Sequence, residues 1–374
     1  MTRTTPHRLL ISLVTLGDPN TLTGGYLYHR RLAELAPQHG ARLEFASFPA
    51  WPFPFPVLYG PRLRRVLSAQ QADVVVLDSI AAAFFGPWMA AVRAPVMAMA
   101  HQPPGGIDHG PVRQHAQAVL DRAAYRRVER VLVASDLLAD QFGARGFAGH
   151  AAVVPPGRDV TPTADGRRRD LRGGARTALL CVGNWVVRKG ILQALDAVAR
   201  LPAGLARLHL VGDDRPEPGY AARVRRRLTR GDLADRVEYH GRLGREEVAA
   251  MYRDADVFVL PSLREPYGTV YGEAMAAGLP VVGWRAGNLP YLASHEREGL
   301  LVEPGDVAGL ASALRRLAED GELRRRLGAA ARRRAATFPT WEQTAERFFA
   351  AAREAAATGA AGPSWRPRPH GPSG

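Results

Sequence analysis

The stretch EPYGTVYGEAMAAGLPVV, from Glu265 to Val282, decides the fold of this part of the chain. Two glutamates, Glu265 and Glu273, stand eight positions apart with glycines between them, and a small-residue helix and a strand are expected to follow. A glycine-containing loop that runs into a helix presents free backbone N–H groups and the positive end of the helix dipole. An anionic phosphate would bind there, and the carboxylates could accept hydrogen bonds from sugar hydroxyls. The alternative is an ordinary connection with two solvated carboxylates, which is the commoner situation for a single glutamate.

A single lysine, Lys189, stands among 50 basic residues, and all the others are arginines. It lies in LLCVGNWVVRKGI, where a hydrophobic strand is predicted to end at Gly183 and a loop and a helix to follow. Lysine is a compact point charge, whereas arginine is a planar fork. A position that must place one charge against a phosphate oxygen can therefore favour lysine. Chance could also leave one lysine anywhere, so its spacing from Gly183 strengthens the argument.

The segment that begins at Glu265 resembles the E-x7-E signature of the family 4 retaining glycosyltransferases, which have the GT-B fold. The resemblance implies that Glu265 contacts the donor sugar and that Glu273 binds the ribose. It also implies that the backbone amides of Gly268, Thr269 and Val270 hold the donor diphosphate.

Gly183 and Lys189 fit the G-R-x-x-x-x-K-G pattern of the same family, which implies that Lys189 neutralises the leaving diphosphate. Two departures from the family are visible. Tyr267 stands where the family usually has Phe, and Asn184 stands where it has Arg. One expected phosphate-binding charge is therefore missing, and whether Arg188 replaces it is left open. We keep Asn184, Arg188 and Tyr267 as candidates for donor binding.

Further candidates lie at the ends of other predicted strands. Gly24 and Gly25 follow the first strand, His101 ends the fourth, and Arg242 follows a strand of the second half. A glycine pair after a strand is usually a turn, and a lone histidine at a strand end is more often structural. The resemblance implies instead that the glycine loop closes over the donor phosphates or the acceptor. It implies that His101 lies near the transferred sugar.

Hydrophobic strands alternate with helices along most of the chain. The first half has strand candidates at 8–16, 41–48, 72–79, 95–101, 130–135 and 150–157, and the second half at 177–183, 205–212, 236–241, 255–262, 278–284 and 299–304. Near-continuous apolar strands alternating with helices indicate parallel, doubly wound sheets. The predicted fold class is α/β, with two Rossmann-like domains facing a cleft, and ligands belong at the carboxyl ends of their strands.

Composition sets the expected domain boundaries. We expect an N-terminal acceptor-side domain over 1–160, a polar, glycine-rich linker over 161–176 and a nucleotide-sugar-binding domain over 177–339. A helix over 340–357 would cross back to the first domain, as the GT-B resemblance implies. The tail, 358–374, reads as disordered from its Gly and Pro content.

The net charge of +14 and the pI near 10.8 are compatible with a nucleotide donor, an anionic membrane or nucleic acid. The sequence has no zinc-finger, homeodomain or RNP pattern, which argues against nucleic acid. It also has neither G-x-G-x-x-G nor G-x-x-x-x-G-K-[ST], which argues against a dinucleotide oxidoreductase and a P-loop kinase. With one cysteine and only a short apolar run at Leu9–Leu16, we expect a cytoplasmic protein.

The segment SFPAWPFPFPVLYGPRLRRVL combines a proline-broken apolar loop with arginines at 62, 64 and 65. It either packs on the first domain or forms a wall of the acceptor site or a contact with the anionic inner face of a membrane.

These observations together predict a retaining glycosyltransferase that moves a sugar from a nucleotide-diphosphate sugar to an unidentified acceptor. A lipid-linked acceptor is one option. We expect no cofactor besides the donor and no metal, because basic groups could replace a cation. The alternatives are a phosphorylase or a nucleotide-sugar hydrolase on the same fold, and an inactive module that binds a nucleotide sugar or a membrane.

Overall fold

The computed structural model describes residues 8–20, 24–147, 151–158 and 169–360. Two compact units make up the chain: unit 1 is Met1–Pro155 with Trp341–Gly374, and unit 2 is Pro156–Thr340. Each unit contains one six-stranded sheet whose strand pairs are all parallel. The prediction of two Rossmann-like α/β domains is therefore confirmed.

Unit 1 has the strand order β2-β1-β3-β4-β5-β6. Its strands are β1 (Leu9–Leu16), β2 (Ala41–Phe48), β3 (Val74–Asp78), β4 (Val96–Ala100), β5 (Arg130–Val133) and β6 (Ala151–Val153). Every residue of β3 and β4 is buried. Helices cover both faces of a doubly wound sheet, which is why these central strands are apolar throughout.

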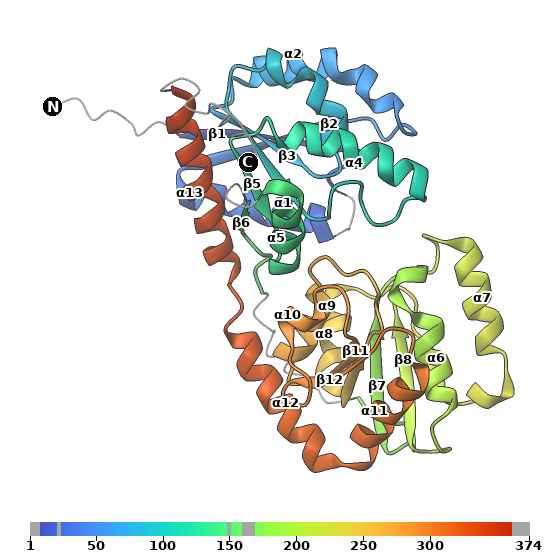
Figure 1. Cartoon of the computed structure of the whole chain (residues 1–374). Helices are drawn as coiled ribbons and strands as arrows, with labels where there is room; N and C mark the ends of the chain where they lie inside the picture. Colours follow the sequence, from blue (N-terminus) through green and yellow to red (C-terminus); the bar gives the residue numbers. More distant parts are fainter. Residues whose placement is uncertain (1–7, 21–23, 148–150, 159–168, 361–374) are drawn as a thin grey trace, which may run out of the picture. The chain divides into compact units, whose positions relative to one another are not determined.

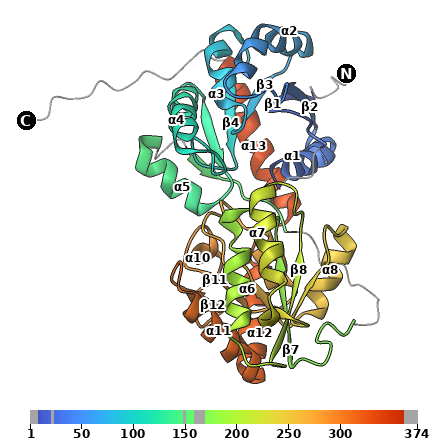
Figure 2. The same ribbon diagram turned by 90° about the vertical axis from the view of Figure 1, so that its right-hand side faces the viewer.

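The α-helices of unit 1 are α1 (Gly24–Leu35), α2 (Gly60–Gln70), α3 (Ala82–Phe85), α4 (Pro111–Tyr125), α5 (Asp136–Phe142) and α13 (Trp341–Ala360). Helices α1 and α13 pack against each other (Figures 1 and 2), and α3 packs on α4 (Figure 2). The C-terminal helix α13 contributes Phe348 and Phe349, both fully buried, to the core of unit 1. It continues to Ala360, three residues beyond the expected end. The remainder of the predicted tail, 361–374, lies outside the described residues.

Unit 2 has the strand order β12-β11-β10-β7-β8-β9. Its strands are β7 (Thr177–Val182), β8 (Ala206–Val211), β9 (Val237–Tyr239), β10 (Val257–Val259), β11 (Val281–Trp284) and β12 (Gly299–Val302). Its α-helices are α6 (Ile191–Ala199), α7 (Pro218–Leu228), α8 (Arg245–Asp254), α9 (Thr269–Ala276), α10 (Leu289–Leu292), α11 (Val307–Glu319) and α12 (Gly321–Ala336). Helices α6, α7 and α11 form one packed group, and α9, α10 and α12 form another; α6 and α7 lie in front of the sheet in Figure 2.

The predicted linker, 161–176, is only partly described, since 159–168 lie outside the described residues. Its described end belongs to unit 2. Leu171 is buried in the core of that unit, and Arg172 forms an ion pair with Asp256 at 2.7 Å. The expectation of a linker up to 176 is therefore wrong for residues 171–176. The polar, glycine-rich composition of the segment predicted a linker, and the single buried leucine that anchors it gave no separate signal.

None of the helices within the described ranges is both long and apolar enough to cross a membrane.

Candidate functional site

In the sheet of unit 2, the strand order reverses at β7: β8 and β9 lie on one side of it, and β10, β11 and β12 on the other. In open α/β sheets, ligands bind outside the carboxyl ends of the strands at such a switch point. The loop after β7 carries Lys189, at the end of the short 3-10 helix Val187–Lys189, and the loop after β10 carries Glu265. The two principal residues predicted from the sequence thus stand on either side of the switch point.

Lys189 and Glu265 contact each other directly. Nζ of Lys189 forms an ion pair with Oε2 of Glu265, and the two side chains are only 10% and 13% exposed. The guanidinium of Arg188 lies 3.7 Å from the same oxygen and donates to the carbonyl of Arg264 at 3.0 Å. Two cations therefore share one carboxylate, which leaves a net positive charge in a partly desolvated position. An anionic diphosphate is attracted more strongly there than at an exposed surface.

The loop that carries Lys189 is held tightly against the loop after β10. Gly190 has a φ of +69°, and a Cβ at this position would lie 2.2 Å from the carbonyl oxygen of Pro261. The carbonyl of Arg188 accepts hydrogen bonds from the backbone N–H of Leu263 at 2.8 Å and from the hydroxyl of Ser262 at 3.1 Å. Only glycine fits the close approach at position 190 without strain.

Helix α9 begins directly after this loop. Gly268 has a φ of +85°, and a Cβ there would lie 2.7 Å from Cδ2 of Tyr271. The hydroxyl of Tyr271 donates to the carbonyl of Leu260 at 2.6 Å, which fixes the helix to the end of β10. The first amides of a helix have no intrahelical acceptor. The backbone amides of Gly268, Thr269 and Val270 therefore stand at the start of a well-anchored helix.

Glu273, the second glutamate of the motif, lies on α9 and is exposed. Its carboxylate forms a hydrogen bond with the hydroxyl of Tyr252 on α8, and burial together with this carboxylate raises the pKa of Tyr252 well above its usual value. Tyr252 was not among the predicted site residues, because α8 precedes the motif and carries no pattern that points to it.

Asn288 is a second residue that the sequence did not single out. It is 2% exposed; its N–H donates to the carbonyl of Glu265 at 2.8 Å and its Nδ2 to the carbonyl of Tyr267 at 2.7 Å. A Cβ at the preceding Gly287 would lie 2.8 Å from the backbone nitrogen of Glu265. This turn follows β11, so Asn288 could have been found from the rule that ligands lie at the carboxyl ends of strands.

The hydroxyl of Tyr267 donates a hydrogen bond to the carbonyl of Pro156 at 3.1 Å, a bond that the phenylalanine usual in the family could not make.

Asn184 and Arg242 lie toward the other side of the switch point. Oδ1 of Asn184 accepts a hydrogen bond from the backbone N–H of Asp213 at 3.1 Å. Asp213 is paired with Arg215 at 2.7 Å, and hydrogen bonds from Arg215 and, more weakly, the charge of Arg242 lower the pKa of its carboxyl group. Asn184 thus supports the loop after β8, while Arg242 faces the same acidic loop from the end of β9.

The position of Arg188 yields a prediction for Asn184. Because Arg188 already places a guanidinium beside Lys189 and Glu265, Asn184→Arg is expected to leave donor affinity within about threefold of wild type, or to weaken it through crowding of like charges. Isothermal titration with the best-binding nucleotide sugar measures this. A Kd at least tenfold tighter in the variant, the gain of about 1–2 kcal/mol expected from a new charged hydrogen bond, would show that the phosphate contact is missing.

Gly24, Gly25 and His101 belong to unit 1 and are described within it. The two glycines form the first residues of α1, not a free loop, and a Cβ on Gly25 would lie 3.5 Å from the ring of His101. His101 contacts His29, with 3.3 Å between their Nε2 atoms, and His29 contacts Asp78. Burial and His29 lower the pKa of His101 to about 3, so its ring is neutral at pH 7.

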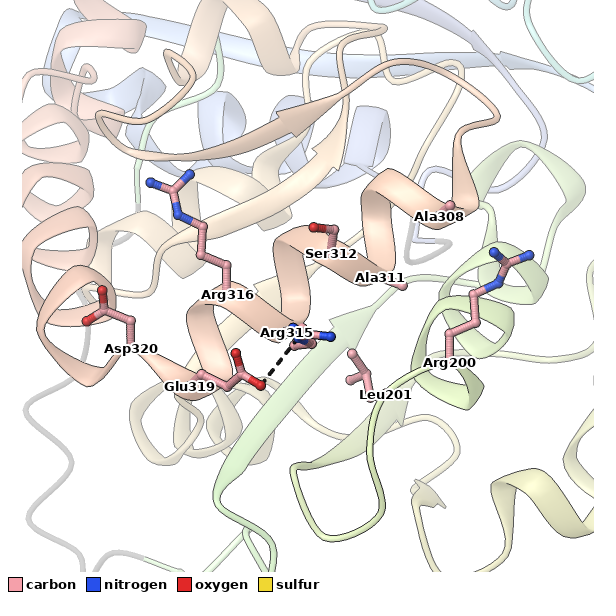
Figure 3. Close-up of a pocket in the computed structure, with 9 residues that line it drawn as sticks. All are labelled: Arg200, Leu201, Ala308, Ala311, Ser312, Arg315, Arg316, Glu319 and Asp320. Carbon is pink, nitrogen blue, oxygen red and sulfur yellow. Dashed lines mark ion pairs between the residues drawn. The ribbon is translucent and has the colours of Figure 1, made fainter.

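The groove drawn in Figure 3 has a volume of about 480 Å³ and lies between the end of α6 and α11. It contains none of the predicted site residues, and two of its three arginines are paired with carboxylates: Arg315 with Glu319 at 3.3 Å and Arg316 with Glu296. We therefore do not assign it to the donor. Its lining residues are Arg200, Leu201, Ala308, Ala311, Ser312, Arg315, Arg316, Glu319 and Asp320.

Comparison with known families identifies both halves of the chain. Residues 11–157 match the family described as glycosyl transferase 4-like domain, and residues 176–320 match glycosyl transferases group 1. An MMP alpha-(1->4)-mannosyltransferase of Mycolicibacterium hassiacum is 30% identical over 332 residues, covering 83% of this chain and 77% of that protein. The chain belongs to the family 4 glycosyltransferases. The resemblance seen in the Glu265–Val282 segment is thereby confirmed.

Other glycosyltransferases match over a shorter part of their length. The mannosylfructose-phosphate synthase of Agrobacterium fabrum is 29% identical over 60% of this chain and 53% of its own length. A D-inositol 3-phosphate glycosyltransferase of Geodermatophilus obscurus is 37% identical over 57% of this chain and 49% of its own length. The matched part of this chain thus spans about half of these two relatives.

Solved structures support the fold. The sucrose-phosphate synthase of Thermosynechococcus elongatus superposes with a TM-score of 0.79 at 22% identity, covering 94% of this chain and all of that one. Anabaena HepE in complex with UDP-glucose superposes with a TM-score of 0.75 at 20% identity, covering 91% and 99%. These likenesses confirm the two-domain GT-B fold class.

Proposed function

We propose that this glycosyltransferase moves a sugar from a nucleotide-diphosphate sugar to an acceptor with retention of anomeric configuration. The observation that carries the proposal is the cation pair of Lys189 and Arg188 on Glu265, at the switch point of unit 2 and in the segment that leads into α9. Preorganised positive charge and helix amides aimed at a leaving diphosphate stabilise the charge that develops as the glycosidic bond breaks.

On this basis we assign the following roles. Lys189 and Arg188 neutralise the diphosphate, and the amides of Gly268, Thr269 and Val270 donate to its oxygens. Glu265 exchanges its contact with Lys189 for hydrogen bonds to the donor sugar. The leaving phosphate accepts the proton of the acceptor hydroxyl, so the proposal requires no separate general base.

No cofactor is part of this proposal, and the two basic side chains take the place of a divalent cation at the diphosphate. Donor affinity is therefore expected to be the same in EDTA and in excess Mg²⁺, as measured by isothermal titration. A loss of at least tenfold in EDTA would contradict this part of the account.

The donor class rests on the site and on a neighbour of the same fold. HepE was solved with UDP-glucose, so uridine diphosphate sugars are the first donors to test. GDP- and ADP-sugars complete the panel. Several relatives are named for reactions that involve sugar or inositol phosphates, so phosphorylated polyols and sugars are the first acceptors, with lipid-linked acceptors next.

Product analysis tests the proposal against its alternatives. The tightest-binding donor is incubated with each acceptor, and the products are identified by mass spectrometry and by the anomeric proton coupling. A glycoside with the donor's anomeric configuration is the expected product. Free sugar in every reaction would indicate a hydrolase, sugar phosphate formed from inorganic phosphate and a glycan would indicate a phosphorylase, and a donor that binds without turnover with any acceptor would indicate a binding module.

Glu273→Ala tests the assignment of the ribose contact. A ribose contact is made in the ground state and the transition state alike, so its loss raises KM and leaves kcat nearly unchanged. We expect KM for the donor to rise about 10–100-fold, the range for a hydrogen bond to a charged group, with kcat within about threefold. Tyr252→Phe, which removes the hydroxyl that contacts Glu273 and the carbonyl of Val270, should raise KM less. A fall in kcat at unchanged KM would place Glu273 at the reacting bond instead.

We also propose that unit 1 contacts an anionic membrane through the Trp51–Arg65 surface. Trp51, Phe55 and Leu58 are 47%, 55% and 69% exposed, and the arginines at 62, 64 and 65 on α2 are exposed beside them. Other residues of the same loop pack inward: the ring of Phe53 contacts Phe84, with 6.0 Å between centroids. The loop therefore divides into an inner side and an outer apolar side flanked by positive charge, which fits the headgroup region of an anionic bilayer.

Sedimentation with anionic vesicles tests this surface. Basic residues near an anionic surface contribute about 1 kcal/mol each, so replacing the three arginines by serine should weaken binding at least about tenfold at low salt. The matched control removes the exposed Arg325, Arg326 and Arg333 of α12, which lowers the net charge equally and should leave binding nearly unchanged. Equal losses of binding in both variants would show that vesicle binding depends only on net charge. Wild-type protein that stays in the supernatant at low salt would contradict the proposal.

A further inference from the structure

Unit 1 contains a buried carboxyl group, that of Asp121 on α4, to which the proposed reaction assigns no role. Asp121 is 1% exposed, and its Oδ2 accepts a hydrogen bond from the backbone N–H of Gly105 at 2.8 Å. Aspartate is almost never fully buried unless it is paired, yet no basic side chain in the described part of the chain pairs with this one. The carboxyl group therefore serves the backbone of the loop between β4 and α4, whose first residue is His101.

This loop lies directly on α4. Gly105 has a φ of +94°, and a Cβ at this position would lie 2.5 Å from the carbonyl oxygen of Gln114. The side-chain amide of Gln114 donates in turn to the carbonyl of Gly106 at 2.8 Å. Only glycine fits so close an approach without strain. A shift of this turn away from α4 must break the hydrogen bond to Asp121.

The polar atoms around the carboxyl group can accommodate both of its protonation states. Gln117, Asp121 and Tyr125 follow one another at intervals of four residues, so they lie on one face of α4, and each is at most 2% exposed. Oε1 of Gln117, Oδ1 of Asp121 and the hydroxyl of Tyr125 are buried without a hydrogen-bond partner among the described residues. Unpaired buried polar atoms cost free energy. A proton on Oδ1 of Asp121 would supply a donor one helical turn from two oxygen acceptors.

Burial also makes the charged form of this group costly. It raises the pKa of Asp121 from 3.8 to about 7, and the hydrogen bond from the Gly105 N–H opposes the rise only in part. Helix α3 and the 3-10 helix Gly86–Ala91, which pack against α4, carry no titratable side chain. The titratable side chains around this face of α4 are those of Tyr125, Asp78, Asp108 and His109.

We propose that Asp121 is a positioning residue of the transfer reaction, whose ionised carboxyl group holds the loop after β4, and with it His101, in the place that turnover requires. Hydrogen bonds to a charged acceptor are roughly twice as strong as those to a neutral one. Protonation of Asp121 therefore loosens the turn at Gly105, and the faster form of the enzyme is the one above neutral pH. The effect on turnover rests on the proposed function, whereas the hold on the loop does not.

Hydrogen exchange measured by mass spectrometry tests the hold on the loop without an activity assay. After correction for the intrinsic exchange rate, residues 105–110 of the wild-type protein should be protected at least about threefold more at pH 8 than at pH 6. In Asp121→Asn, which keeps the shape of a neutral carboxyl group, protection should be equal at both pH values. The control Glu129→Gln, at an exposed carboxylate just before β5, should follow wild type. Equal protection of wild type at pH 6 and pH 8 would overturn the proposal.

Turnover and stability separate positioning from a structural role. The kcat of wild type should rise at least about threefold between pH 6 and pH 8, and Asp121→Asn should stay at the lower value with an unchanged Kd for the donor. Because the pKa of Asp121 is raised in the folded protein, the stability that its neutral form contributes is lost as pH rises from 3.8 to about 7. Asp121→Asn should therefore keep or raise the Tm at pH 8.

Three results would count against this role of Asp121 or against the reaction itself. A lower Tm in Asp121→Asn with the wild-type pH profile of kcat would show that Asp121 is structural. Absence of turnover in wild type would contradict the proposed function, whereas loss of the pH-dependent protection would overturn the role of Asp121 whatever the activity. If Asp121→Asn fails to fold by circular dichroism, the exchange of the wild-type protein at the two pH values decides.

Discussion

Replacing Lys189 by alanine is expected to lower kcat about 10²–10³-fold, the loss seen when one preorganised contact to developing charge is removed. The side chain is nearly buried at the switch point of unit 2 and holds its ammonium group against Glu265. In the proposed site, the diphosphate would then meet only Arg188 and the amides of α9. Steady-state kinetics with the best donor and acceptor gives the value.

Two further variants separate a specific contact from general charge. Lys189→Arg should recover only part of the rate, because a planar fork does not match a single oxygen as a compact ammonium does. Arg200→Ala, which removes an exposed positive charge elsewhere in unit 2, should turn over normally. Near-normal kcat for Lys189→Ala would remove this residue from the reaction.

Glu265→Gln is expected to reduce kcat by about 10²-fold with KM changed only a few-fold. The amide keeps the shape of the side chain and can still bond a sugar hydroxyl, but it no longer carries the charge that Lys189 and Arg188 share. A contact that strengthens toward the transition state acts on kcat rather than on uniform binding. The same assay as for Lys189 measures it.

Glu273→Ala, expected to act on KM, is the internal comparison for Glu265→Gln. If Glu265→Gln raised KM and Glu273→Ala lowered kcat, the roles of the two glutamates would be exchanged. A Glu265→Gln variant with reduced Tm and unchanged kcat would show that the ion pair of Lys189 and Glu265 stabilises the fold and does not act in the reaction.

Much of the fold could be predicted from the sequence, because strands buried on both faces of a parallel sheet consist of nearly continuous apolar residues. Each of the twelve predicted strands overlaps an observed one, and β2 agrees at both ends. The anchoring of Leu171 in unit 2 was missed, because one apolar residue among arginines and glycines gives no periodic signal. The glycines at 24 and 25 begin α1 in the structure, a position where a low helix propensity is tolerated.

The candidate site was predicted where the chemistry lies in one motif and missed where it depends on contacts across the sheet. Lys189 and Glu265 were predicted from the spacing of residues within their motifs. The structure brings them together because the strands that precede them, β7 and β10, are neighbours at the switch point. Tyr252 and the His29–Asp78 contact have no local pattern, since each acts through a partner brought close only by folding. Asn288 follows the end of β11 and could have been found from its place after a strand.

The most direct test of the account is equilibrium binding of a panel of UDP-, GDP- and ADP-sugars to the wild-type protein and to Lys189→Ala and Arg200→Ala. We predict that at least one donor raises the Tm of wild type and of Arg200→Ala alike, with a Kd at least tenfold weaker for Lys189→Ala, as expected for a lost hydrogen bond to a charged group. A panel that binds none of the three proteins, or binds all three equally, would contradict a nucleotide-sugar site built on Lys189.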